Sequence, residues 1–250
     1  MSELGELLSE GKTKVVYEHP FCCDYSYLLH KDSISAGDGA RRDTLRGKGA
    51  LACRTTSSVF SLLARKGIAT HFISMVSDDV TLVKHCKMIP LEVVMRRIAT
   101  GSYLRRHPGT EEGARFEPVL VEFFLKDDAR HDPFISPSEI MEAGIASAEE
   151  VDQMTLTGRQ VFEALEKAWA SQDVVLIDCK IEYGRDAGGN LLVADVIDND
   201  SWRLWPGGDK KRMLDKQIYR DMPQVTDERL ALLLSSYEEV ARRTDEWRGR

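Results

Sequence analysis

Alternating charged residues mark a predicted hairpin in the C-terminal half of the chain. Asp178, Lys180 and Glu182 are spaced by two residues, so they share one face of a strand. Gly188-Gly189 is a natural two-residue turn, and counting outward from it places Glu182 opposite Asp195. Two facing carboxylates repel unless a cation lies between them, and oxygen ligands without His or Cys suit Mg²⁺. The pattern predicts a Mg²⁺ site, and its alternative is a solvated face on which Lys180 bridges the acids.

Two lysines follow a glycine near the N-terminus, in the segment Glu10-Gly-Lys-Thr-Lys14. This segment is not a P-loop, because a P-loop follows a strand and opens a helix, whereas this one precedes a predicted strand. A glycine turn entering a strand can instead place Lys12 and Lys14 on one side of the chain, over a triphosphate. From this motif alone, a turn with solvated lysines is the simpler interpretation.

Three more segments carry polar chemistry. Arg96 precedes Thr100-Gly-Ser102, which offers guanidinium donors, a hydroxyl and backbone amides to a phosphate or carboxylate. Asp195–Pro206 holds three aspartates, one arginine and two tryptophans in twelve residues. Lys126–Pro133 is polar and follows an apolar strand. Their ordinary alternatives are a charged strand end, a tryptophan-anchored turn with solvated acids, and a solvated loop.

The elements that must position these residues are mostly strands in the first half of the chain. Strands are predicted at Thr13–Glu18, Tyr25–His30, Thr70–Ser77, Thr81–Cys86, Leu91–Ile98 and Val119–Leu125. Helices are predicted at Arg42–Lys66, Glu149–Trp169 and from Thr226, as N-cap, to Arg243, with a loop over Gly101–Pro118 and a hairpin of Val174–Gly184 with Leu191–Ile197. Because no regular βαβ rhythm appears, the fold class is α+β.

Composition narrows the functional classes. The 250 residues include 34 Lys and Arg against 41 Asp and Glu, and a net charge of −7 argues against a general nucleic-acid binder. A local basic pocket can still hold a small anion. The apolar run Leu230–Leu234 is far too short to span a bilayer, and no secretory leader pattern is present. Five cysteines without a CxxC pair indicate reduced cytoplasmic thiols.

Taken together, the ordered segments resemble the SAICAR synthetase family over roughly residues 8 to 240. The matching segments are Glu10–Lys14, Ile34–Ala36, Ile89–Glu92 with Arg96 and Thr100–Ser102, Phe124–Asp128 with His131–Pro133, Ile177–Gly184 and Asp195–Trp205. The resemblance implies an enzyme of purine biosynthesis. With ATP and Mg²⁺ it would join a carboxylated aminoimidazole ribonucleotide (CAIR) to L-aspartate through an acyl phosphate, releasing ADP and phosphate.

The resemblance also implies an ATP-grasp-like architecture and a set of site residues. A small β-rich ATP-binding lobe would span residues 1–88, a larger α+β lobe residues 89–250, with a cleft between them. The implied ATP-binding residues are Lys12, Lys14, Met88, Glu182 and Asp195, of which Glu182 and Asp195 hold Mg²⁺. The implied substrate-binding residues are Arg96, Ser102, Asp132, Lys180, Asp200, Arg203, Lys216 and Arg220. Lys180 and Asp200 are the expected catalytic residues.

The chain departs from the family pattern at Gly37-Asp38, where many members carry an aromatic residue before the aspartate, so no role is assigned to Asp38. Asn199–Trp205 resembles the animal-type enzyme, which is usually fused to an AIR carboxylase. We therefore expect either an isolated domain or a single-function, cytoplasmic enzyme. Its expected partners are small molecules, neither nucleic acid nor membrane, and a homo-oligomer is left open. The rival functions are a small-molecule kinase and a non-catalytic nucleotide-binding module.

Overall fold

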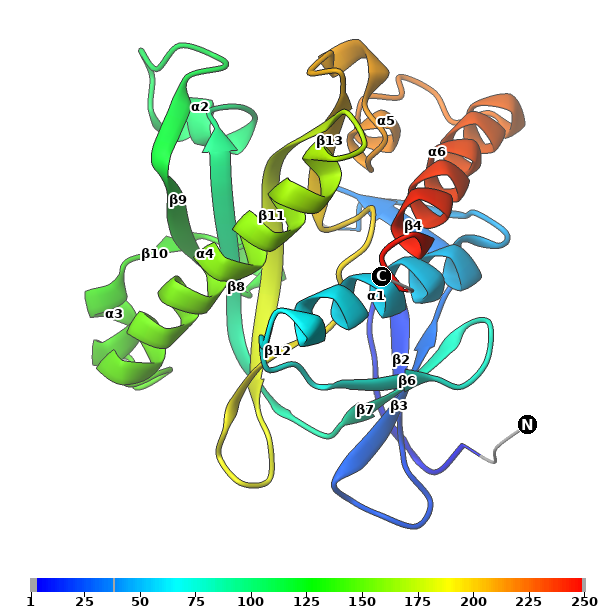
Figure 1. Ribbon diagram of the computed structural model, residues 1–250, viewed down its shortest axis with the longest axis vertical. Helices are drawn as coiled ribbons and strands as arrows, with labels where there is room; N and C mark the ends of the chain where they lie inside the picture. Colours follow the sequence, from blue (N-terminus) through cyan, green and yellow to red (C-terminus); the bar gives the residue numbers. More distant parts are fainter. Residues whose placement is uncertain (1–3, 38, 249–250) are drawn as a thin grey trace.

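Two antiparallel sheets organise the structure, a computed structural model that describes residues 4–37 and 39–248 (Figure 1). The first sheet has five strands, all from the first 84 residues. In sheet order they are β1 (Leu7–Glu10), β2 (Lys14–Glu18), β3 (Tyr25–His30), β7 (Val80–Lys84) and β6 (Phe72–Met75). A separate two-stranded ribbon joins β4 (Ser33–Ala36) to β5 (Arg41–Thr44).

The second sheet has six strands and forms the centre of the molecule. Its order is β10 (Phe134–Ile135), β9 (Arg115–Leu125), β8 (Lys87–Ile98), β11 (Val174–Arg185) and β12 (Leu191–Ala194), with β13 (Trp202–Pro206) also paired to β11. The strands β12 and β13 lie along the same edge of β11, one beside each half of it. Strand β11 therefore contacts three neighbours and is the central strand of this sheet.

Three long helices cover the sheets, and two of them begin at a residue whose side chain caps the helix. They are α1 (Lys48–Arg65), α4 (Ala148–Ala170) and α6 (Asp227–Asp245). Helix α4 starts with a capping box of Ser147 and Glu150, and α6 with Thr226 as its N-cap. Shorter elements are α2 (Ser102–Arg106), η1 (Asp128–Arg130), α3 (Pro137–Glu142), η2 (Lys210–Arg212) and α5 (Gln217–Arg220). In Figure 1, α4 crosses the second sheet while α6 packs against α1.

The main core lies between α4 and one face of the second sheet. Cys179, Ile181 and Tyr183 of β11 alternate toward this core, where they are buried with Phe162 and Trp169 of α4. The residues between them in sequence face the opposite side of the sheet, because strand side chains alternate. One face of β11 thus stabilises the fold, and the other is available for chemistry.

The α+β prediction is confirmed, and the structure corrects several element boundaries. The predicted helix Arg42–Lys66 begins only at Lys48, because Gly47 adopts φ +89° and the residues before it pair as β5. The predicted loop Gly101–Pro118 contains α2 and the start of β9. Trp202–Pro206, where a tryptophan-anchored turn was the alternative, is a strand paired with β11.

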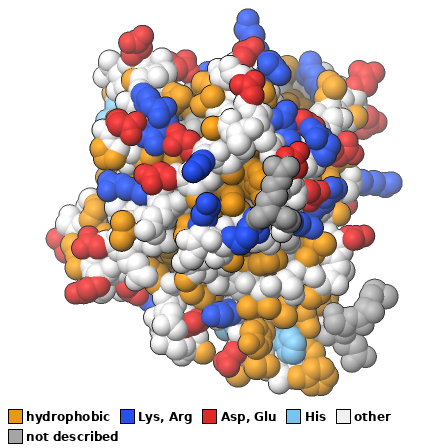
Figure 2. Space-filling model, viewed as in Figure 1, with side chains coloured by type: hydrophobic (Ala, Val, Ile, Leu, Met, Phe, Trp, Pro, Cys, Tyr) orange, Lys and Arg blue, Asp and Glu red, His pale blue; other side chains and the backbone are white. Residues whose placement is uncertain are grey.

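The visible surface mixes charges of both signs. Figure 2 shows Lys and Arg side chains interspersed with Asp and Glu, while hydrophobic side chains gather at the lower edge, over β2 and β3. Within the described part of the chain, none of the helices has the length and apolar character needed to cross a bilayer. The five cysteines are free thiols.

Candidate active site

A cavity of about 680 Å³ lies between the Gly11–Lys14 segment and the second sheet. Eight Lys or Arg and seven Asp or Glu side chains line it, so charges of both signs concentrate in one place. Met88, by contrast, is 40% exposed on β8 and does not line this cavity. The other predicted site residues all line it: Lys12, Lys14, Arg96, Ser102, Asp132, Lys180, Glu182, Asp195, Asp200, Arg203, Lys216 and Arg220.

Six residues from two neighbouring strands form one wall of the cavity. On β11 they are Asp178, Lys180 and Glu182, and on β8 they are Arg96, Val94 and Glu92. The register pairs them directly, with Asp178 opposite Arg96, Lys180 opposite Val94 and Glu182 opposite Glu92. The shared face predicted for the β11 triplet agrees with this arrangement, because all three side chains reach the same cavity.

The hairpin after β11 differs from the prediction by one residue. Its loop has three residues, because the Asp186 amide donates to the carbonyl oxygen of Asn190 at 3.1 Å and Gly189 adopts φ +77°. The Asp186 carboxylate fixes this loop by accepting from the amides of Gly188 and Asn190. Glu182 therefore pairs with Ala194, and the predicted direct opposition of Glu182 and Asp195 is wrong. The loop is one residue longer than predicted because the Asp186 side chain stabilises it through these hydrogen bonds.

The carboxylate that faces Glu182 belongs to Glu92, and Lys180 lies between the two. The Lys180 Nζ is 2.7 Å from Glu92 Oε1 and 3.3 Å from Glu182 Oε1. Burial would lower the pKa of Lys180, but Glu182 and Glu92 raise it above its ordinary value. The bridging lysine weighed as an alternative is thus present, although Glu182 is buried rather than solvated.

Asp195 reaches the cavity from just beyond β12, at a residue with φ +64°. It forms an ion pair with Lys14, the first residue of β2. Burial would raise the pKa of Asp195, but Lys14 and Lys180 hold it well below its usual range. Lys12 lies beside them, with its Nζ 2.7 Å from Asp128 Oδ1 of η1. This end of the cavity combines ionised carboxylates with lysines.

The same end suits a hard cation. Lys126 Nζ lies 2.6 Å from Glu182 Oε2, and Lys126 and Lys180 both act electrostatically on Asp195, so Glu182 and Asp195 share their lysine neighbours. Across residues 4–37 and 39–248, no three His, Cys, Asp or Glu side chains form a group that could hold a metal. Two carboxylates are enough for Mg²⁺ that also binds substrate phosphates. The donor set therefore fits Mg²⁺ carried with ATP.

Arginines define the other end of the cavity. Arg96 donates from Nη1 to Asp178 Oδ2 at 3.0 Å and from Nη2 to Ser102 Oγ at 3.3 Å. Arg203 forms an ion pair with the same Asp178 oxygen, so one buried carboxylate holds two guanidiniums. A Cβ on Gly101 would lie 2.7 Å from Arg203 Nη2 and would displace the guanidinium, and the φ of +58° at this residue also favours glycine. Asp178 was not among the predicted site residues, although its spacing from Lys180 and Glu182 placed it on their face.

Asp200 also lines the cavity and has three close partners. Lys216 Nζ is 3.1 Å and Lys48 Nζ 3.5 Å from Asp200 Oδ2, and the Tyr237 hydroxyl donates to Oδ1 at 2.6 Å. Burial would raise the pKa of Asp200, but Lys48 and Lys216 hold it well below its usual range. The sequence did not identify Lys48 and Tyr237 as site residues, because each lies within a predicted helix and belongs to no recognisable motif.

The remaining predicted residues have local partners. Asp132 Oδ1 accepts from the Asp127 amide at 2.8 Å, which holds it at the end of the η1 turn. Arg220 contacts Gln217 on α5, with its Nη1 3.3 Å from Oε1. Asp38 lies outside the described residues, between two glycines that line the cavity.

Comparison with known proteins gives one consistent result. Residues 7–232 match the family model described as SAICAR synthetase. The chain is 64% identical over 244 residues to a phosphoribosylaminoimidazole-succinocarboxamide synthase of Roseiflexus sp. (strain RS-1), covering 98% of each chain. It is 46% identical to the multifunctional protein ADE2 of Gallus gallus, covering 97% of this chain and 59% of that one. The higher bacterial identity means that the comparisons do not single out an animal-type relationship.

Solved structures agree with the sequence comparison. A structure titled SAICAR synthetase (Type-2) in complex with ADP superposes with a TM-score of 0.86 at 32% identity, covering 96% of this chain and 98% of that one. The synthase of Ehrlichia chaffeensis also gives 0.86, at 29% identity and with the same coverage. The chain therefore belongs to the SAICAR synthetase family, the ATP-dependent ligases of purine biosynthesis that join CAIR to L-aspartate.

Proposed function

We propose that this cavity ligates CAIR to L-aspartate through an acyl phosphate formed from ATP. The observation that carries the proposal is the division of the cavity into two ends joined by one sheet wall. Lysines and ionised carboxylates gather around Asp195, whereas paired guanidiniums gather around Asp178. The first end suits a triphosphate with its cation, and the second suits the anionic groups of a ribonucleotide.

The chemistry must activate a carboxylate, which does not react with an amine because it is negatively charged and oxide is a poor leaving group. A CAIR carboxylate oxygen attacks the γ-phosphorus of ATP, and ADP leaves. The aspartate amine nitrogen then attacks the acyl carbon, phosphate leaves with the former carboxylate oxygen, and the amine loses a proton. Both steps depend mainly on positioning and on neutralising charge.

At the ATP end, Lys12 and Lys14 would bind phosphate oxygens as they enter β2. Glu182 and Asp195 would hold Mg²⁺, which when bound would neutralise charge on the phosphates. Met88, exposed on β8, would contact the adenine outside the cavity wall. Lys180 stays protonated beside Glu92 and Glu182, so it supplies fixed positive charge next to the transferred phosphoryl group.

At the substrate end, Arg96, Ser102 and Arg203 would grip the ribonucleotide. Arg96 donates to Asp178 and Ser102, and Arg203 pairs with Asp178, so these contacts orient the three side chains before the substrate arrives. Lys180 and Asp200 are proposed as the catalytic residues that contact CAIR. The other residues proposed to line the nucleotide and its acceptor are Asp132, Lys216 and Arg220.

We also propose that the chain divides into lobes at residues 88 and 89. The strands of the first sheet end at Lys84 and those of the second begin at Lys87, so the change of sheet falls just before this boundary. A cytoplasmic location is proposed from the free thiols. A homo-oligomer stays a prediction, to be measured by light scattering.

The deciding experiment incubates the protein with ATP, Mg²⁺ and CAIR, with and without L-aspartate, and follows ADP and the products by mass spectrometry. A succinocarboxamide product is expected only with aspartate. Steady ADP release that aspartate does not affect, with a stable phosphorylated product, would identify a small-molecule kinase. Binding of ATP without any turnover would identify a nucleotide-binding module.

A further inference from the structure

The carboxylate of Asp200 is held from behind by two residues that do not line the cavity. Tyr237, on α6, donates its hydroxyl to Oδ1 at 2.6 Å. Lys48, the first residue of α1, places Nζ 3.5 Å from Oδ2. Neither residue is among the cavity-lining side chains, whereas Asp200 and its third partner Lys216 are.

The position of Lys48 is unfavourable for the helix that carries it. Only 1% of the side chain is exposed, and no acidic residue is present in the first turn of α1. A cation at a helix N-terminus opposes the helix dipole, and an ammonium taken out of water is costly unless it is paired. Asp200 is the ion-pair partner of Lys48, and the charges of Asp198 and Asp32 also stabilise the Lys48 ammonium from farther away.

Tyr237 completes the arrangement on the other side. Its ring centre lies 5.7 Å from Lys48 Nζ, so the two residues contact each other as well as Asp200. The Asp200 amide also donates to Asp198 Oδ1 at 2.8 Å, which fixes the backbone. The charged and titratable groups that face this carboxylate are therefore Lys48, Asp198, Lys216 and Tyr237, with Arg220 acting on the last two.

We propose that Lys48 and Tyr237 are positioning residues that fix the orientation and charge of Asp200 for the ribonucleotide substrate. They act on the ligation only through Asp200, so the inference rests on the proposed contact between Asp200 and CAIR. Tyr237 lies beyond residues 7–232, the part that matches the family model. The C-terminal helix α6 therefore takes part in the site without touching the cavity.

The direct test is Tyr237→Phe, which removes one hydroxyl and keeps the ring. We expect kcat to fall roughly 10-fold, the equivalent of one hydrogen bond to a charged group, while the KM for ATP stays unchanged. Tyr183→Phe is the matched control, because Tyr183 is equally buried and its hydroxyl donates to the Met154 carbonyl oxygen at 3.1 Å, away from Asp200. Wild-type kcat in Tyr237→Phe, or an equal loss in Tyr183→Phe, would overturn the proposal.

A double-mutant cycle separates positioning from a structural effect. Tyr237→Phe is combined with Asp200→Asn, and turnover is measured by product mass. If Tyr237 acts through Asp200, Tyr237→Phe adds almost nothing to the loss already caused by Asp200→Asn. Independent, multiplying losses would refute the inference. Wild-type turnover in Asp200→Asn would instead refute the proposed role of Asp200, so the two failures are distinguishable.

The charge of Lys48 is tested with Lys48→Met and Lys48→Arg. Methionine keeps much of the chain length without the charge and should lower kcat as Tyr237→Phe does, whereas arginine should retain more activity. Equal activity of the two variants would contradict an electrostatic role. If either variant fails to fold, the tyrosine cycle decides.

Discussion

Arg203→Ala tests whether the arginine end of the cavity binds CAIR and not ATP. Arg203 is largely buried, and the bond donated to Asp178 uses one of its five guanidinium donors. The others are available to a bound anion. One hydrogen bond between charged groups contributes about 1.5–3 kcal/mol, so CAIR should bind roughly 10–150-fold more weakly.

The substitution should leave the fold intact. Asp178 keeps Arg96, whose Nη1 stays 3.0 Å from the same carboxylate oxygen, so no buried charge is left without a partner. Isothermal titration calorimetry on the folded variant should give a weaker Kd for CAIR and an unchanged Kd for ATP. Urea unfolding run in parallel reports the cost to stability.

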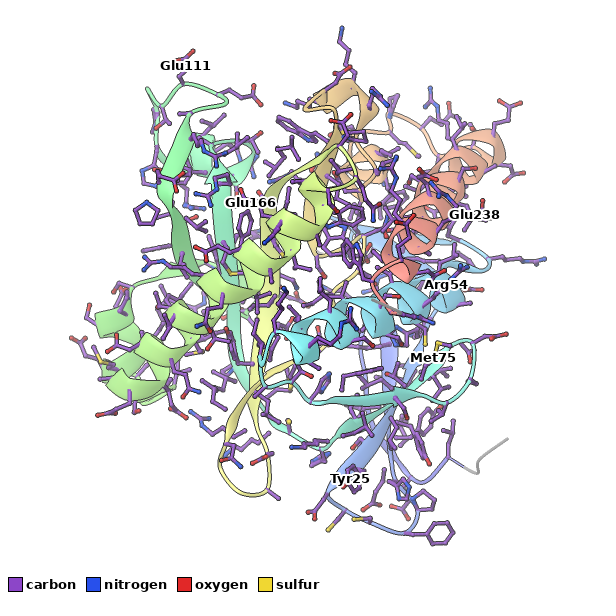
Figure 3. All side chains as sticks on the ribbon, viewed as in Figure 1. Tyr25, Arg54, Met75, Glu111, Glu166 and Glu238 are labelled. Carbon is purple, nitrogen blue, oxygen red and sulfur yellow. The ribbon has the colours of Figure 1, made fainter. Side chains whose placement is uncertain are left out.

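The matched control is Arg97→Ala. Arg97 follows Arg96 on β8 but points to the other face, where its Nε lies 2.7 Å from Oε1 of Glu166. Figure 3 labels Glu166 on α4. This variant should lose stability and keep its CAIR affinity. Equal losses of CAIR and ATP affinity in Arg203→Ala, or a weaker CAIR Kd in Arg97→Ala, would refute the division of the cavity.

Two further predictions concern the metal ligands and acid stability. Glu182→Gln and Asp195→Asn should fold, by circular dichroism, but lose nearly all turnover, and a wild-type rate at ordinary Mg²⁺ would contradict the metal assignment. Burial, with Lys14 and Lys48 nearby, lowers the pKa of His30 to about 3. Below about pH 6.5, His30 therefore binds a proton in the unfolded chain but not in the folded chain, so the free energy of unfolding falls as the pH drops. The stability advantage of the wild type over His30→Gln should shrink by roughly 2 kcal/mol between about pH 6.5 and 4.5, measured by urea unfolding; a constant difference would refute this.

Local patterns predicted most of the fold and of the cavity. Period-two charge on β11 placed Asp178, Lys180 and Glu182 on one face, and the structure puts all three in the cavity wall. The N-cap Thr226 was predicted because a side-chain oxygen that accepts from the first turn is a local property. Elements whose identity depends on a distant partner were missed. Strand β13 forms only because β11 lies beside it, and β4 and β5 form only as a pair.

The wrong partner predicted for Glu182 shows the limit of assigning strand pairs by counting residues outward from a turn. Two glycines indicated a two-residue loop, but the Asp186 carboxylate accepts from three amide groups and stabilises a longer one. Lys48 and Tyr237 show a second limit, since they come from helices that are far apart in sequence. Their contact with Asp200 depends on tertiary packing, so it cannot be predicted from the spacing of residues in the sequence.

The pairing of β8 with β11 in the cavity wall also determines where residues can be inserted into this protein. Asp178 and Glu182 are four residues apart on one strand, so about 13 Å of rigid backbone separates the two ends of the cavity. A single inserted residue within β11 would turn every later cavity side chain into the core beneath α4, and every later core side chain into the cavity. The loop Asp186–Asn190 follows the last cavity residue of β11, and its residues from Ala187 to Asn190 are exposed. We therefore expect insertions, tags or reporter peptides to be tolerated at this loop, because the strand still fixes the distance between the two ends of the cavity.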